Sequence, residues 1–227
     1  MPGYPHLVPV LAARLGPPAP QLPAPYCDDG PMTLSLPIGP EANALLARSP
    51  FALLMAMLLD QQVPMERAFS APYDLAQRLG HEPTADELAG YDPEALTAVF
   101  SERPALHRYP RAMAGRVQEL ARVIAADYEG DAARIWRDVT TGQNLLKRVS
   151  ALPGFGSYKA QIFVALLGKQ FDVRPAGWRE AAGPYGAEGT FHSVADIEDG
   201  ESLGKVRAHK QEMKAAAKAT AKPRAHR

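Results

Sequence analysis

Two glycines, two residues apart, lie in the stretch LPGFGSYKA at 152–160, immediately before an apolar-periodic run. Because Gly154 and Gly156 lack a Cβ, the backbone there can adopt positive φ and a ligand can approach closely. Ser157 is placed to cap the helix that follows, which leaves the first amide N–H groups of that helix free. Free amides at a helix N-terminus attract an anion, most naturally a phosphate, and Lys159 adds a positive charge nearby. The chemistry predicted here is contact with backbone phosphates, which positions a protein without reading sequence.

Two helices must position this turn. A helix predicted over 143–150 leads into it, and a second over 157–169 leads out of it. Together they form a helix–hairpin–helix over 143–169, in which Leu152 and Phe155 would pin the turn between the two helices. The alternative is an ordinary tight turn between packed helices, in which the glycines hold no ligand.

Helix signals also run through the preceding part of the chain. Ser49 followed by Pro50 is typical of a helix start, and 51–59 then places apolar residues at helical spacing, which predicts one buried face. A longer helix is predicted between Tyr109 and Gly130. Two short helices are predicted from their caps, Thr84 with Glu87 and Asp92 with Pro93.

Strand signals are absent from the sequence. The nearest candidate, FDVRP at 171–175, contains a proline that argues against a central strand. We therefore predict an all-α fold, arranged as two helical lobes. With 227 residues, 46% of them hydrophobic and 22% charged, the chain has the composition of a globular protein.

Several classes of protein are disfavoured. The longest apolar stretch, 51–59, is too short to span a bilayer, so we expect no membrane helix. The single cysteine, Cys27, excludes an internal disulfide and any all-cysteine metal or iron–sulfur site within one chain, and we expect no metal site. Residues 1–31 are rich in proline and do not resemble a secretory signal, so we interpret them as a disordered extension, with Met32 a candidate translation start. We expect a cytoplasmic protein.

Charge is unevenly distributed although the net charge is zero. From Lys205 to Arg227 eight Lys or Arg residues accompany one acid, so 205–227 carries +7 and residues 1–204 carry −7. A basic tail suits nucleic acid, because neutralising phosphates releases condensed counterions. The alternative is a solvated, partly helical or disordered tail.

The hairpin stretch resembles that of the helix–hairpin–helix (HhH-GPD) superfamily of base-excision repair DNA glycosylases, whose members carry an LPGxGxxxA-like signature. Upstream, LLMAMLLDQQVPMERAF resembles the ILxQQxS segment of alkyl-purine glycosylases and endonuclease III relatives. The resemblance covers about 41–180 and implies two helical lobes with a DNA-binding groove between them. We accordingly divide the chain into the extension, a repair domain over 32–180, a loop over 181–204 and a basic tail over 205–227.

Site residues are carried over by position. The resemblance implies that Gln62 wedges into the duplex and fills the gap left by an extruded base, since an amide can replace lost hydrogen bonds. Tyr158 matches an aromatic that lies against the flipped base, and Asp60, beside the wedge, is a further carboxylate that could face the base pocket. The alternatives are a polar helix end for Gln62 and Asp60 and ordinary packing for Tyr158.

The catalytic acid departs from the family pattern. The superfamily aspartate falls twenty to twenty-two residues beyond the second hairpin glycine, at the positions of Ala176, Gly177 and Trp178. The nearest acids are Asp172 and Glu180, and Asp172 is our candidate for the catalytic carboxylate, with a loop or capping role as the alternative.

The resemblance also bears on a lyase lysine and on bound metal groups. The position of the lyase lysine is occupied by Tyr158, and Lys159 would point about 100° away, which argues against a Schiff-base lyase. The cysteine cluster of endonuclease III is absent, so no iron–sulfur cluster is expected. The resemblance allows a monovalent cation at the hairpin.

Three functions follow from these observations. The first is a repair protein that binds damaged or mismatched double-stranded DNA, flips a base and, as a monofunctional glycosylase, hydrolyses its N-glycosidic bond near the nucleoid. The second is a noncatalytic DNA-binding or lesion-sensing protein of the same fold that has lost the acid. The third is an all-α interaction protein that uses the helix GESLGKVRAHKQEMKAAAKA against a partner, without binding DNA.

Overall fold

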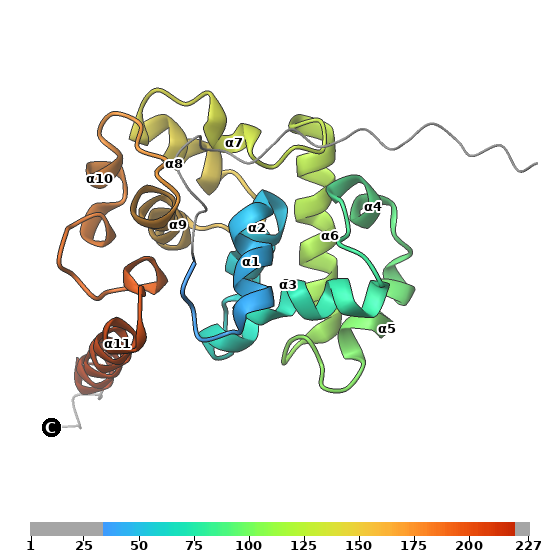
Figure 1. Ribbon diagram of the computed structural model, residues 1–227, viewed down its shortest axis with the longest axis horizontal. Helices are drawn as coiled ribbons and strands as arrows, with labels where there is room; N and C mark the ends of the chain where they lie inside the picture. The colour runs from blue at the N-terminus through green and yellow to red at the C-terminus, as the bar shows by residue number, and fades with distance from the viewer. Residues whose placement is uncertain (1–33, 221–227) are drawn as a thin grey trace, which may run out of the picture. The chain divides into compact units, whose positions relative to one another are not determined.

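The computed structural model describes residues 34–220, which form helices joined by short connections (Figure 1). The α-helices are α1 (Pro40–Arg48), α2 (Pro50–Leu59), α3 (Met65–Leu79), α4 (Ala85–Gly90), α5 (Pro93–Ser101), α6 (Pro110–Asp127), α7 (Arg134–Arg137), α8 (Gly142–Ser150), α9 (Ser157–Gln170), α10 (Trp178–Ala181) and α11 (Gly200–Thr220). Two 3-10 turns, η1 (Gly183–Tyr185) and η2 (Val194–Asp196), precede α11. No strand occurs within 34–220, where the only β-type pairing outside strands is the bridge Thr141–Ala176. The predicted all-α fold is confirmed, while the extension 1–31 lies outside the described residues.

Local capping explains where several helices begin. Ser49 accepts a hydrogen bond from the N–H of Ala52 at the start of α2, and Asp92 accepts one from Ala95 at the start of α5. Thr84 caps α4 in the same way. Each cap satisfies one of the amides that a helix start leaves without a partner. These predicted helix starts are confirmed.

Helix α2 lies at the centre of the core rather than at its edge. Every side chain from Phe51 to Leu59 is buried, so the prediction of a single buried face is wrong. The physical reason is that all nine of these residues are apolar, and a helix that is apolar all round is stabilised only where neighbours cover every side. In the structure α2 packs on α1, α3 and α6.

Helices α4 to α6 and α8 to α10 form two further sets, which Figure 1 shows in green and in yellow to orange. In the first set α4 and α5 pack on α6, whose Met113, Val117, Leu120 and Ile124 are buried. In the second set α8 and α10 pack on α9. The second set contains the predicted hairpin, and α9 is buried over 162–168.

The segment 181–204 differs from the predicted loop. It contains η1 and η2, and α11 already begins at Gly200. Lys169 of α9 makes an ion pair with the buried Asp196, and Gln170 donates to the carbonyl oxygens of Ala195 and Ile197. These polar contacts shape the segment without an apolar periodicity, which explains why the sequence pattern did not reveal it.

Helix α11 contacts the rest of the described chain through its first half, including an ion pair of Arg207 with Glu66. Ser202 and Val206 are buried, and the hydroxyl of Ser202 accepts hydrogen bonds from the N–H groups of Glu198 and Asp199. From Lys210 onward the described side chains of the helix are exposed. Among the helices of 34–220, none taken singly has the length and hydropathy of a membrane span, and α1 with α2 reach them only as a pair bent by 115°.

Candidate nucleic-acid interface

The predicted helix–hairpin–helix is present as α8, a tight turn and α9. Leu152 and Phe155 are both buried in the turn, and the Phe155 ring lies edge-on to that of Phe163 at a centroid distance of 5.8 Å. Gly154 adopts a φ of +78°, and a Cβ at this position would overlap the side chain of Leu58. Gly154 is therefore required both by the backbone conformation and by the close approach of α2.

Gly156 has a different environment from Gly154. Its φ is −70°, which any residue can adopt, and a Cβ built there meets no atom within 4 Å. This residue is also the N-cap of α9. The prediction that Ser157 caps the helix is therefore wrong, because Ser157 is already the first helical residue and no side chain makes a capping hydrogen bond.

The amides at the start of α9 are available to a ligand. Ala160 is the first residue whose N–H bonds back to the turn, at 2.9 Å from the carbonyl oxygen of Gly156. Within 34–220 the N–H groups of Ser157, Tyr158 and Lys159 have no backbone acceptor. Because α9 has 14 residues, its dipole adds positive potential at these amides. The arrangement can hold a phosphate.

The hairpin also offers oxygen ligands of the kind a monovalent cation needs. The carbonyl oxygens of Leu152 and Gly156 accept N–H groups of Phe155 and Ala160. Those of Pro153, Gly154 and Phe155 accept no backbone N–H from the described residues. These three oxygens therefore keep lone pairs free for a further ligand.

Lys159 does not extend toward the ligand side of the hairpin. Its Nζ donates a hydrogen bond of 2.9 Å to the carbonyl oxygen of Leu58, at the C-terminal end of α2. Burial lowers the pKa of Lys159 to about 8, although the neighbouring Asp60 opposes this shift. The lysine thus satisfies a terminal carbonyl of α2 and fastens the hairpin to that helix.

The α2–α3 connection, residues 60–64, is braced through Gln61. The amide of Gln61 donates to the Leu58 carbonyl oxygen at 2.6 Å, and its Oε1 accepts from Arg116 at 2.6 Å. The backbone oxygen of Gln61 accepts from Nε2 of the buried His107 at 3.0 Å. No sequence pattern indicates this bracing set, since Gln61, His107 and Arg116 are far apart along the chain and form no local motif.

His107 braces the connection as a neutral imidazole. Its Nδ1 accepts the N–H of Tyr109 at 3.0 Å, which leaves the proton on Nε2 for Gln61. Burial lowers the pKa of His107, in agreement with this arrangement.

Gln62 follows directly and is exposed. Its φ of +59° lies in the left-handed region, which costs a non-glycine residue free energy unless its surroundings impose it. The fixed backbone of Gln61 supplies that constraint. The structure thus presents Gln62 at the surface beside the hairpin, since Leu58 joins the two segments.

Asp60 follows Leu58 by two residues, at the C-terminal end of α2. Burial raises the pKa of Asp60, whereas the positive charges of Lys210 and Lys159 lower it. The electrostatic influence of residues from α9 and α11 on this carboxylate indicates that α2, the hairpin and α11 converge around it. Asp60 is a partly desolvated acid, as catalytic carboxylates often are.

The structure does not bring Asp172 to the hairpin. Asp172 follows the C-terminal end of α9, is 68% exposed at its side chain and makes an ion pair with Arg174 at 3.1 Å. A helix of the length of α9 spans about 21 Å, which separates Asp172 from the amides at Ser157. Glu180 lies on α10 and is also exposed.

The positions at which the glycosylase pattern has its aspartate serve packing instead. Ala176 pairs its backbone with Thr140 and Gly142, at 3.1 and 2.8 Å. The ring of Trp178 lies against Gly168, where a Cβ would overlap it. This stretch closes the hairpin unit and carries no acid.

Tyr158 is exposed beside the free amides. The residue is 66% exposed, and its ring lies edge-on to the ring of Tyr185 at a centroid distance of 5.5 Å. Burial and a hydrogen bond with Tyr158 raise the pKa of Tyr185. Beyond Tyr185 the row continues to His192 and then to His209 of α11, with the two imidazoles stacked at 4.4 Å. The exposed Tyr158 can stack on a base.

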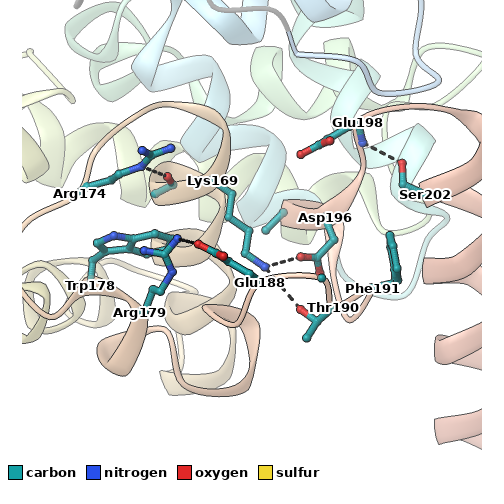
Figure 2. A pocket seen from close by; sticks show the side chains of 13 residues that line it. Lys169, Arg174, Trp178, Arg179, Glu188, Thr190, Phe191, Asp196, Glu198 and Ser202 are labelled. Atoms are coloured by element: carbon teal, nitrogen blue, oxygen red, sulfur yellow. Dashed lines mark hydrogen bonds and ion pairs between the residues drawn. The ribbon is translucent and has the colours of Figure 1, made fainter.

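A cavity of about 330 Å³ lies at the other end of α9 (Figure 2). Figure 2 shows Lys169 directed at Asp196 and Thr190, and Arg179 makes an ion pair with Glu188. The charges of Lys169, Asp196, Arg179 and Glu188 are therefore paired within the chain. No group of three or more His, Cys, Asp or Glu residues with metal-binding geometry occurs in the part of the chain that the structure describes.

Comparison with known proteins agrees with this geometry. Residues 55–223 match the sequence profile of the HhH-GPD superfamily base excision DNA repair protein family. No curated protein matches the chain. The matched range begins within α2 and includes the 60–64 connection, the hairpin and α11. The chain therefore belongs to the HhH-GPD superfamily of base excision DNA repair proteins.

Proposed function

We propose that this protein binds duplex DNA containing a damaged or mismatched base, extrudes that base and hydrolyses its N-glycosidic bond. The observation that carries the proposal is the junction at Leu58, whose carbonyl oxygen accepts from both Lys159 and Gln61. Through it, the phosphate-binding amides, the exposed Gln62 and the partly buried Asp60 belong to one rigid arrangement.

Each part has a role in base extrusion. The amides of Ser157 to Lys159, with Gly154 and Gly156, hold a backbone phosphate and so position the duplex. Gln62 enters the stack and replaces the hydrogen bonds of the orphaned partner base. Tyr158 stacks on the extruded base.

We assign the carboxylate role to Asp60 in preference to Asp172. As the bond between C1′ and the base nitrogen breaks, its electron pair leaves with the base and positive charge develops on the sugar. A carboxylate stabilises that charge and takes a proton from water as the oxygen of the water bonds to C1′, and the proton then passes to the departing base. The product is a free base and an intact abasic site, which is the outcome of a monofunctional glycosylase.

The test uses duplexes that carry an alkylated purine, uracil, hypoxanthine or oxidised guanine, with alkali to cleave abasic sites. Wild type, Asp60→Asn and Asp172→Asn are assayed together. Breaks that disappear only in Asp60→Asn support the assignment. Breaks that disappear only in Asp172→Asn transfer the role to that residue and contradict our assignment.

A noncatalytic DNA-binding or lesion-sensing protein is the second candidate. The observation that favours it is the packed, acid-free stretch of Ala176 to Trp178. It predicts salt-dependent duplex binding without breaks on any substrate. For either function, the corresponding place of action is the DNA of the cytoplasmic nucleoid.

A further inference from the structure

Helix α11 carries a stripe of positive charge on one side. At 3.6 residues per turn, the residues Arg207, Lys210, Lys214 and Lys218 fall within about 80° of one another around the helix axis. Both acids of the helix, Glu201 and Glu212, fall outside this sector. We call these four residues the basic face of α11.

The basic face begins at the α2–α3 connection. Arg207 makes an ion pair with Glu66 in the first turn of α3, and Lys210 lies close enough to Asp60 to lower the pKa of that carboxylate. Because Gln62 lies between these two acids in the chain, the basic face starts beside the proposed wedge. It then continues along a part of α11 whose described side chains are exposed.

Most of the charge on this face makes no ion pair with the described residues. Across residues 34–220, no carboxylate makes an ion pair with Lys210, Lys214 or Lys218. Successive lysines four residues apart are separated by about 6 Å along the helix. Like charges at this spacing repel one another and gain from a linear polyanion that neutralises them.

We propose that the basic face of α11 contacts the phosphates of the same duplex that the hairpin holds, on the side of the wedge nearest Asp60. This inference rests on the proposed function, because it takes duplex DNA as the partner. It adds a second, sequence-independent contact to the hairpin. The contact raises affinity for damaged and undamaged duplex alike, since phosphates carry no sequence information.

The test compares Lys210→Gln/Lys214→Gln/Lys218→Gln with a control that removes the same charge elsewhere. The control is Arg111→Gln/Arg122→Gln/Lys205→Gln, which changes two exposed residues of α6 and one on the opposite side of α11. Binding of an undamaged duplex is measured by fluorescence anisotropy over a range of salt concentrations. We expect the slope of log K against log salt to fall by about 2.7 in the lysine variant, at 0.9 per phosphate contact, and by less than about 1 in the control.

Two additional variants separate this inference from the function on which it rests. Lys→Arg at the same three positions should keep the wild-type slope, so a loss there would indicate a folding defect and overturn the interpretation. Gly156→Ala should weaken binding through the hairpin. If Gly156→Ala weakens binding and the lysine-to-glutamine variant keeps the wild-type slope, the α11 contact is wrong while the proposed function stands. If wild type shows no salt-dependent binding to duplex DNA, both fail.

Discussion

Lys159 and Leu58, 101 residues apart, are joined by a hydrogen bond from the lysine Nζ to the leucine carbonyl oxygen. The side chain of Leu58 also occupies the space that a Cβ on Gly154 would need. Leu58 therefore contacts the hairpin through both its backbone and its side chain. A substitution at the end of α2 should accordingly change the stability of the hairpin, and the reverse should also hold.

The two hairpin glycines should respond differently to the same substitution. Gly154→Ala places a Cβ at positive φ and against Leu58, which should lower the free energy of unfolding by about 2 kcal/mol. Gly156→Ala meets open space at an ordinary φ and should leave stability within about 0.5 kcal/mol. It should nevertheless weaken duplex binding, because its methyl group obstructs the approach of a phosphate. Urea unfolding and anisotropy measure the two effects.

The coupling to Leu58 has its own control. Because Leu58→Ala removes the atoms that Gly154→Ala would strike, the double variant should be less destabilised than the sum of the two single variants. Additive losses would show that the overlap with Leu58 does not determine the cost at Gly154.

Asp60→Asn should make the protein more stable at neutral pH and inactive. Since burial raises the pKa of Asp60, the folded state holds the proton more tightly than the unfolded chain, and stability falls as pH rises above 3.8 through the raised pKa. Asparagine carries no charge, so at pH 7 it removes the free-energy cost of burying the ionised Asp60 carboxylate. At pH 3 the wild-type carboxyl is already largely protonated, so asparagine brings no such gain. The rate of base excision should fall at least about 100-fold.

Asp172→Asn is the matched control, because that carboxylate is exposed. It should change the unfolding free energy by less than about 0.5 kcal/mol at either pH. A stability of Asp60→Asn below that of wild type at pH 7, with activity retained, would contradict both parts of the prediction.

Lys159→Met should reveal the buried amine through the pH dependence of stability. The pKa of Lys159 is about 8 in the folded protein and near 10.5 in the unfolded chain. The unfolded state therefore binds more protons between these values, so wild type gains stability as pH rises from 8 to 10.5. Lys159→Met lacks this gain, so its free energy of unfolding relative to that of wild type should be lower at pH 10 than at pH 7. Lys214 is exposed, so the control variant Lys214→Met should show no such difference.

Gln62→Ala should weaken binding to damaged duplex by roughly tenfold, or about 1.4 kcal/mol, and binding to single strands much less. Gln62→Gly should show the same loss while it raises stability, since glycine adopts the φ of +59° without strain. Equal losses on duplex and single strand would remove the wedge role. Anisotropy with a duplex and its separated strand makes the comparison.

The local features of the fold were predictable from short-range signals. The caps at Ser49 and Asp92 and the buried Leu152 and Phe155 depend on neighbours within a few residues. The inward direction of Lys159 could not be predicted in this way, because its partner lies in another helix. The positive charge of Lys159 alone predicted a place on the phosphate side of the hairpin.

The candidate acid illustrates the same limit. Spacing along the chain made Asp172 the nearest acid to the position of the family aspartate, but the length of α9 separates it from the hairpin. The charges that act on Asp60 come from Lys159 and Lys210, which are distant from it along the chain. Local sequence patterns therefore could not predict this environment. Gln62 was selected by resemblance, and its left-handed backbone became visible only with the bracing of Gln61.

The backbone pairing between Thr141 and Ala176 has a consequence for how the protein opens. Thr141 directly precedes α8, and Ala176 follows α9. The pairing therefore holds together the two ends of the hairpin unit, residues 141–176. These residues are expected to open as one cooperative unit, separately from fraying at the end of α11. The amide hydrogens of Gly142 and Ala176, which make the pairing bonds, should then exchange with solvent deuterium at the slow rate of the α9 interior, although Ala176 itself is exposed.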